Sequence, residues 1–432
     1  MIPFEIPPWL MLPFLFLIGC CVGSFVNVCV HRIPQHERLS DQLRGLWSPP
    51  SRCPKCLNPI PSRDNIPIFG WLMLGGRCRN CRLKISIRYP LVELANGLLF
   101  VLAYLTEVPF EYGASVEQGS LFTPLGPQYA TEWSAVFHLN VRFLYHMVLF
   151  EALLVASLID YDLKIIPDGS TVPAMVVGVL AAGAFGNLYL VPVWFQDPSL
   201  AKQMAQLLPD GVPFISMSTI VPAWTSEFPR LHGLAVSAAG FVVGGGMTWS
   251  VRLVGQWILR REAMGFGDVI LMALIGSFVG WQVSVIIFLM APLCALLGIV
   301  GSFFYRRARE IPYGPFLSLS TLLVVLFFKQ IWPFWERIFS TGMMVPAMAV
   351  VGLVLMIVSL YGIQSFKKMM GISLYDREVC TEEWSSADQL GYQYSENQDR
   401  HQGRWRTEDW PGLDSGLGMS HHERWRHGQG RR

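Results

Sequence analysis

The sequence predicts an all-α fold: a polytopic integral membrane protein of eight or nine transmembrane helices with a small cytoplasmic zinc-knuckle domain. Only 15% of the 432 residues are charged and 52% are hydrophobic, whereas soluble proteins average about 25% charged residues. A transmembrane helix needs about 20 mostly apolar residues, and nine stretches meet or approach this length. Two of them, between Asp268 and Tyr305, are short and lack a clear polar loop. The nine stretches are residues 9–30, 89–105, 143–159, 172–194, 233–251, 269–283, 284–304, 315–334 and 343–363.

The charges of the connecting segments predict the orientation of these helices. Residues 31–88 contain eleven Lys and Arg and three acids, whereas residues 107–141 contain four Glu and no Lys or Arg. Because basic loops stay in the cytoplasm, the first segment is expected inside and the second outside. Nine crossings would place the N-terminus outside and the C-terminal tail inside, with residues 195–231 as a second outer loop. Membrane lipids would surround the helices.

The C-terminal tail differs in composition from the rest of the chain. Residues 363–432 hold 21 of the 64 charged side chains and show no apolar periodicity, which predicts disorder. The formal net charge of the whole chain is +2. A balance this close to zero gives no basic field that would point to nucleic acid, so no nucleic-acid partner is expected.

Two C-x-x-C pairs give the strongest signal in the polar segments. They are Cys53 with Cys56 and Cys78 with Cys81, separated by 21 residues. Each pair can place two thiolates on one metal, and two pairs complete a tetrahedral Zn²⁺ site. The separation lies just above the usual 15 to 20 residues. Because cytoplasmic thiols stay reduced, a metal is favoured over disulfides, with a redox or metal-free role as the alternative.

Two acids lie at the predicted cytoplasmic ends of apolar stretches. Asp160 ends the third stretch, where Pro167 predicts that the helix stops nearby. Asp268 follows Gly265 and Gly267, which let the backbone turn before an apolar helix begins. Ionisable groups at membrane depth are costly, so each is a functional candidate.

Two carboxylates on one membrane face can converge when their helices pack together. Close like charges do not both ionise easily, so such a pair would share one proton. Aspartic proteases use this arrangement to activate water and to polarise the scissile carbonyl. The alternative for Asp268 is a favourable interaction with a helix dipole. Asp162 and Asp168 are interpreted as loop acids and Arg88 as a lipid-facing or domain-surface charge, and the pattern alone leaves open whether Asp160 meets Asp268.

Further motifs accompany these residues in a fixed order. They are Gly23-Ser-Phe-Val-Asn-Val28, His31-Arg-Ile-Pro34, Asp64-Asn-Ile-Pro67, Ser86-Ile-Arg-Tyr-Pro-Leu-Val-Glu93, the segment Asp160–Asp168, Gly265-Phe-Gly-Asp268 and Ile311-Pro-Tyr-Gly-Pro-Phe316. Together with both C-x-x-C pairs, they resemble the type IV prepilin peptidases (prepilin leader peptidase and N-methyltransferase) over most of residues 14–335. Each motif is weakly specific, whereas their order and spacing together are very specific.

The resemblance implies up to two activities in one chain. The family's catalytic aspartates correspond to Asp160 and Asp268, which would remove the leader of a prepilin-like or pseudopilin precursor on the cytoplasmic side of the cell inner membrane. The family's cysteine domain corresponds to residues 31–90. In bifunctional members this domain is associated with methylating the new N-terminus from S-adenosyl-L-methionine. Assembly of a type IV pilus and protein secretion are both open as the biological role.

The helices, the cysteines and the resemblance together predict five parts of the chain. These are 1–30 as the first transmembrane helix, 31–90 as the cytoplasmic four-cysteine domain, 91–335 as the transmembrane aspartic peptidase domain, 336–366 as an additional transmembrane helix and 367–432 as a polar, disordered cytoplasmic tail.

Two other classes of function remain as alternatives. A transporter or proton-coupled protein also uses paired intramembrane acids, although acids at helix ends on one side, rather than at the midplane, disfavour it. A zinc-bearing membrane scaffold without catalysis would use only the cysteine domain.

Overall fold

The computed structural model describes residues 8–48, 50–53, 55–108, 132–195, 197, 224–259, 264–304, 312–342 and 344–370. Most of the two predicted outer loops, 107–141 and 195–231, therefore lie outside the described residues. The predicted tail is described only as far as residue 370, so its disorder stays a prediction.

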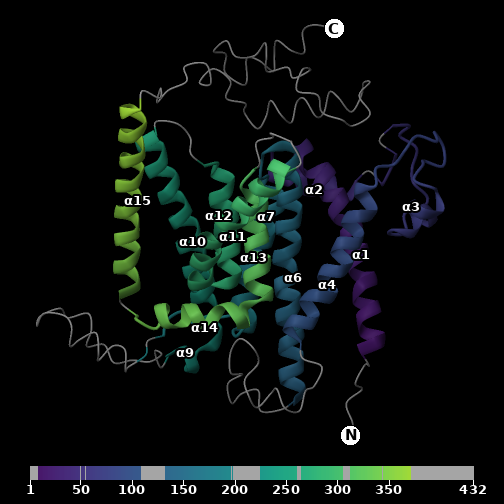
Figure 1. The fold of residues 1–432 in the computed structure, drawn as a ribbon. Helices are drawn as coiled ribbons and strands as arrows, with labels where there is room; N and C mark the ends of the chain where they lie inside the picture. The colour runs from purple at the N-terminus through teal and green to yellow at the C-terminus, as the bar shows by residue number, and fades with distance from the viewer. Residues whose placement is uncertain are drawn as a thin grey trace, which may run out of the picture.

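Helices make up nearly all of the described chain, and the long ones form a bundle that one further helix crosses at its end (Figure 1). The described residues contain no strand, only two isolated β-bridges in the cysteine-rich segment. The predicted all-α fold is therefore confirmed. The long helices are α1 (Pro8–Arg32), α4 (Arg88–Glu107), α6 (Glu132–Leu163), α7 (Asp168–Phe185), α10 (Pro229–Leu259), α11 (Phe266–Val279), α12 (Trp281–Phe304), α13 (Gly314–Leu326), α14 (Phe328–Phe339) and α15 (Met344–Met369). The short ones are η1 (Ile33–Gln35), α2 (Leu39–Trp47), η2 (Ser62–Asp64), α3 (Phe69–Met73) and α9 (Trp224–Glu227).

The number of membrane spans agrees with the lower end of the prediction. Seven described helices are long and apolar enough to cross a membrane, and an eighth span results when α13 and α14 count as one bent span. The predicted stretch 269–283 corresponds to α11, which has only 14 residues. At 1.5 Å per residue α11 is about 21 Å long, shorter than the ~30 Å hydrocarbon core of a bilayer.

In two of the predicted stretches, the straight helix ends before the apolar sequence does. The stretch 315–334 breaks at Phe327, where the chain turns by 93° from α13 into α14. Helix α14 is amphipathic, with Phe328 and Phe339 buried and its polar side chains exposed, so it lies across the bundle rather than along it (Figure 1). The stretch 172–194 stops being helical at Phe185, because the next residue is a glycine with a positive φ of 81°.

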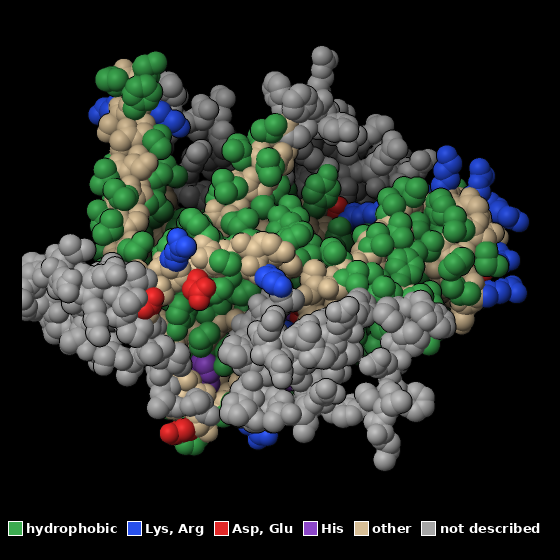
Figure 2. Space-filling model, turned by 60° about the horizontal axis from the view of Figure 1, so that its bottom comes forward, with side chains coloured by type: hydrophobic (Ala, Val, Ile, Leu, Met, Phe, Trp, Pro, Cys, Tyr) green, Lys and Arg blue, Asp and Glu red, His purple; other side chains and the backbone are tan. Residues whose placement is uncertain are grey.

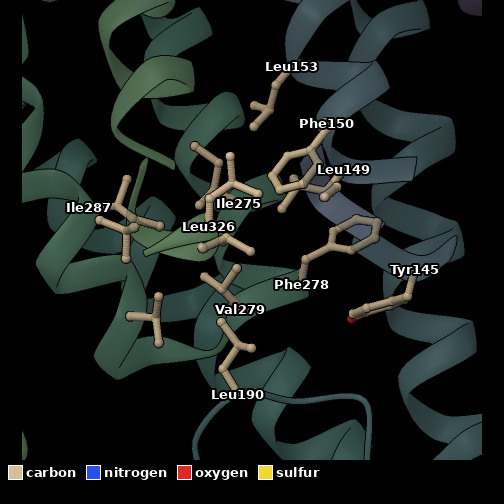
Figure 3. Close-up of a cluster of buried hydrophobic side chains, with 14 of the residues drawn as sticks. Tyr145, Leu149, Phe150, Leu153, Leu190, Ile275, Phe278, Val279, Ile287 and Leu326 are labelled. Carbon is tan, nitrogen blue, oxygen red and sulfur yellow. The ribbon is translucent and has the colours of Figure 1, made fainter. Parts of the chain in front are cut away.

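Helix α11 forms the centre of the bundle. Every residue from Asp268 to Val279 is buried except Ile270. Figure 3 shows side chains of α11, among them Phe278, packed against side chains of α6 such as Phe150. A helix that is apolar on all sides is stable when protein surrounds it, which explains why α11 need not match the bilayer thickness.

The backbones of α10 and α11 lie almost in contact. A Cβ added to Gly240 would collide with the carbonyl oxygen of Gly276, and one added to Gly276 would collide with the carbonyl oxygen of Gly240. Membrane helices lack a hydrophobic driving force between them, so small residues that permit such close approach stabilise their packing. The central helix is therefore held in a fixed position.

The two ends of the bundle differ. Helices α2 and α3 lie at one end, at the top of Figure 1, and α9 and α14 lie at the other. On the face shown in Figure 2, hydrophobic side chains cover much of the described surface, whereas Lys and Arg gather at the edge that carries the cysteine-rich domain. This distribution fits a bundle in lipid with a domain in water at one end. The exposed basic residues of the domain include Arg52, Lys55, Arg63, Arg77 and Lys84.

Candidate active site and metal centre

The four cysteines predicted to bind metal lie together. Their sulfur atoms are all within 4.8 Å of one another, and the four thiols could hold a metal ion. The Sγ atoms of Cys53 and Cys81 are 3.9 Å apart, and those of Cys56 and Cys78 are 4.0 Å apart. A tetrahedral Zn²⁺ with Zn–S bonds of about 2.3 Å needs sulfurs ~3.8 Å apart. The donor set therefore fits Zn²⁺.

Two loops of the same shape carry these cysteines. The amide of Cys53 donates to the carbonyl of Asn58, and the amide of Leu57 donates back to Cys53. The amide of Arg82 donates in the same way to the carbonyl of Cys78. Leu57 and Arg82 both have a positive φ, 57° and 59°, which residues other than glycine seldom adopt. The loops thus hold each pair of thiols in a tight turn.

Backbone hydrogen bonds make two of the thiols more acidic. The amide of Cys81 lowers the pKa of the Cys78 thiol to about 7, and the amide of Asn58 lowers the pKa of Cys56. Burial instead raises the pKa of Cys53 to about 11. Because the thiolate is the metal ligand, the more acidic thiols are the first that a metal would capture.

A partly buried hydrogen bond attaches the cysteine-rich domain to the bundle. The amide of Ile68 donates to Oε2 of Glu93 at 2.7 Å. Glu93 is only 8% exposed, and Ile68 has a φ of +63°, which is rare for a β-branched residue. The carboxylate of Glu93 therefore fixes an unusual turn of the domain against α4.

The two predicted acids lie at the same end of the bundle, on different helices. Asp160 is in the last turn of α6 and Asp268 in the first turn of α11, and they are 6% and 8% exposed. The segment that follows Asp160 contacts the start of α11, since a Cβ added to Gly267 would lie 3.0 Å from Cβ of Ile166. The helices that carry them also pack against α13.

A third helix completes this site. The amide of Gly314, the first residue of α13, donates to Oδ2 of Asp160 at 3.1 Å. A Cβ at Gly314 would collide with the same carboxylate oxygen, so a larger residue there would displace the Asp160 carboxylate. The sequence motif Ile311–Phe316 contains Gly314, but the motif alone assigns it no role.

Tyr313 also lies beside the pair. Burial, together with the nearby charge of Asp268, raises the pKa of Tyr313 to about 12, so its hydroxyl stays protonated at neutral pH. Sequence reasoning assigned no function to Tyr313, although it precedes Gly314 in the same motif.

The remaining acids and Arg88 differ from their predicted settings. Asp162 lies in the last turn of α6 and Asp168 begins α7, so both occupy helix ends rather than a loop. Arg88 does not simply face lipid or water, because its Nη1 forms an ion pair with Oδ2 of Asp162 at 2.6 Å. Sequence patterns missed this pair because 74 positions separate the two residues.

Comparison with family models places two matches on the chain. The bacterial peptidase A24 N-terminal domain matches residues 17–106, and the type IV leader peptidase family matches residues 204–300. The first range contains the four cysteines and the second contains Asp268, whereas Asp160 lies between them.

Curated relatives match over a larger part of the chain. A "Prepilin leader peptidase/N-methyltransferase" of Klebsiella pneumoniae is 34% identical over 64% of this chain and 88% of its own length. A "Type 4 prepilin-like proteins leader peptide-processing enzyme" of Escherichia coli O78:H11 is 31% identical over 71% of this chain and 90% of its own length. A relative from Aeromonas salmonicida (strain A449), with the same name as that of Klebsiella, is 28% identical over 74% and 91%. No solved structure matches the chain.

Proposed function

Because this chain belongs to the type IV leader peptidase family, we propose that it removes the leader from prepilin-like or pseudopilin precursors. Asp160 and Asp268 are the proposed catalytic pair. One observation carries the assignment: two buried acids lie at the same end of the bundle, in the last turn of α6 and the first turn of α11, beside a glycine amide of α13 that binds Asp160.

The proposed chemistry follows from two carboxylates that share one proton. The ionised carboxylate takes a proton from a water molecule, which then attacks the scissile carbonyl carbon. The protonated carboxyl polarises the carbonyl oxygen and later supplies a proton to the leaving amine. The hydrogen bond from Gly314 to Oδ2 fixes the rotation of the Asp160 carboxylate. Its other oxygen stays available for water.

The precursor can reach this site without leaving the membrane. The pair lies at the helix ends on the side that carries the basic cysteine-rich domain, which is the cytoplasmic side by the positive-inside rule. The family and the apolar helices indicate a multi-pass inner-membrane protein. The apolar helix of a precursor would stay in the bilayer while its leader enters from the cytoplasm.

Methylation of the new N-terminus is the second proposed activity. The relatives from Klebsiella pneumoniae and Aeromonas salmonicida are named as N-methyltransferases, and S-adenosyl-L-methionine would supply the methyl group. No residue is assigned to that donor. The four-cysteine site is proposed to bind structural Zn²⁺ through Cys53, Cys56, Cys78 and Cys81, because its sulfur spacing fits tetrahedral coordination.

The division of the chain into five parts is also proposed. Residues 31–90 would be the cysteine-rich domain and 91–335 the peptidase domain. The segments 1–30 and 336–366 would be the first and the additional transmembrane helix, and 367–432 the cytoplasmic tail. The two cysteine loops lie outside the helix bundle, which supports a boundary between the cysteine-rich domain and the peptidase domain. The long helix α15 supports the additional span.

The test is leader removal from a pilin-like precursor in membranes that contain the intact protein, Asp160→Asn or Asp268→Asn. Each variant is expected to lose cleavage while remaining folded. Glu336→Gln is the matched control, since this acid is exposed on α14 at the other end of the bundle. Equal processing by all four proteins would reject the pair, whereas no processing by the intact protein would favour a transporter or a scaffold instead.

A further inference from the structure

The segment that follows Asp160 is held at both of its ends by residues from the N-terminal part of the chain. This segment, residues 162–169, runs from the end of α6 into the first turn of α7. We propose that Gln42 and Arg88 are positioning residues for Asp160: they hold residues 162–169 so that its carboxylate faces Asp268. This inference rests on the proposed function of the pair.

Gln42 holds the α7 end of the segment. Its Oε1 accepts a hydrogen bond from the amide of Gly169 at 2.7 Å, and its Nε2 donates to the carbonyl of His36 at 2.8 Å. Amides in the first turn of a helix have no partner within the helix, so Gln42 supplies one to α7. Gln42 is only 3% exposed, and a Cβ at Gly169 would lie 2.5 Å from its Oε1. Gln42 therefore packs closely against Gly169.

Arg88 holds the α6 end of the segment. Its Nη1 lies 2.6 Å from Oδ2 of Asp162, two residues after Asp160. The side chains of Arg88 and Asp162 are 42% and 26% exposed, and ion pairs near water contribute little to stability, about 0–1 kcal/mol. Their contribution is therefore expected in the position of the α6 end rather than in the stability of the fold.

The middle of the segment touches the other two helices of the site. A Cβ added to Gly267 would lie 3.0 Å from Cβ of Ile166, and one added to Gly314 would lie 3.4 Å from its Cδ1. Ile166 therefore fits between the start of α11 and the start of α13. A displacement of residues 162–169 would move Ile166 against the glycine amide that binds Asp160.

Apolar packing joins the same parts of the molecule. Ile159 and Leu163, on either side of Asp160, belong to one buried cluster with Ile33 of η1 and Val92 of α4. This buried cluster therefore joins the end of α6 to the parts of the chain near Gln42 and Arg88. The polar contacts at 162–169 then fix the direction of the chain after α6.

The first experiment measures steady-state cleavage of a purified pilin-like precursor by the full-length protein and its Gln42 variants. Gln42→Met keeps the volume and removes both hydrogen bonds, and kcat is expected to fall about tenfold with KM within about twofold. Misplacing a catalytic group by ~1 Å can lower a rate by up to about 100-fold. Gln42→Glu keeps the acceptor oxygen for Gly169 but loses the donor to His36, so it should restore only part of kcat.

The second experiment exchanges the charges of the ion pair. Arg88→Glu and Asp162→Arg should each lower kcat by about threefold, and the double variant should recover most of this loss, because the pair is restored in reverse. The exchange stays informative even if Gln42→Met does not fold. Thermal unfolding and zinc content are measured for every variant.

The outcomes separate this inference from the proposed function. A wild-type protein that cleaves, with unchanged kcat in Gln42→Met and no rescue in the charge exchange, overturns the positioning role and leaves the catalytic pair intact. A lower unfolding temperature with normal kcat per folded molecule also overturns it, since the residues would then be only structural. A wild-type protein that cleaves no precursor overturns the proposed function, and this inference with it.

Discussion

The metal centre and the carboxylate pair are assembled over very different lengths of chain. Cys53 and Cys81, at the two ends of the metal centre, are 28 positions apart, and each knuckle loop closes with its own hydrogen bonds. Asp160 and the glycine amide that holds it are 154 positions apart, on helices α6 and α13. The metal centre is therefore a local structure, whereas the acid site exists only when three helices pack. A mutation that disturbs helix packing should therefore impair the acid site and leave the metal centre intact.

The largest expected effect concerns the acids themselves. Asp160→Asn or Asp268→Asn should lower the rate of leader removal by at least about 10³-fold. The reason is that the asparagine carboxamide cannot exchange a proton with water or substrate as a carboxyl group does. Single-turnover cleavage measures this loss. Zinc content and methylation of a precleaved pilin should stay at wild-type level, and their loss would contradict the separation of the two centres.

A methyl group at Gly314 tests whether packing alone defines the acid site. Gly314→Ala places a Cβ against the Asp160 carboxylate and should lower kcat by about 10²-fold, as expected when a catalytic group is misplaced. Gly352→Ala is the matched control, because a Cβ there meets no atom within 4 Å. Equal kcat in both alanine variants would show that Asp160 does not need this geometry.

The thiols of the metal-free domain should differ in reactivity as pH changes. The pKa of Cys78 is lowered to about 7 and that of Cys53 is raised to about 11, and the thiolate is the form that reacts. After zinc is removed, alkylation of Cys78 should rise as pH increases through about 7, whereas Cys53 should react only at much higher pH. Peptide mass spectrometry after brief iodoacetamide treatment gives the order. Faster labelling of Cys53 at pH 7 would contradict it.

Removing the metal should have the smallest effect on cleavage. Cys78→Ser or a chelator should abolish zinc binding, since a tetrahedral site needs all four ligands, and should also abolish methyl transfer. Gln42 and Arg88 lie outside the two knuckle loops, so cleavage should fall by less than about threefold as long as α2 and α4 stay packed. The rate of cleavage and the zinc content are measured on the same samples. A complete loss of both cleavage and methyl transfer would mean that the two cysteine loops are needed to keep the peptidase site in place.

The outline of the fold could be predicted because membrane helices have a strong local signal. Each of the nine apolar stretches contains a helix in the structure. Composition averaged over a window does not show which side of a helix is apolar, so the amphipathic helix α14 was predicted to continue α13. It also does not show what surrounds a helix, and α11 can be shorter than the bilayer because protein rather than lipid covers it.

Short segments of sequence were enough to predict the four cysteines of the metal centre and the two acids at helix ends, because spacing and charge carry both signals. The bond from Gly314 to Asp160 and the pairing of Arg88 with Asp162 could be seen only in the folded chain. The difference follows from the distance along the chain over which each contact forms. A C-x-x-C turn closes through hydrogen bonds between near neighbours, whereas contacts across 74 or 154 positions form only after whole helices have packed.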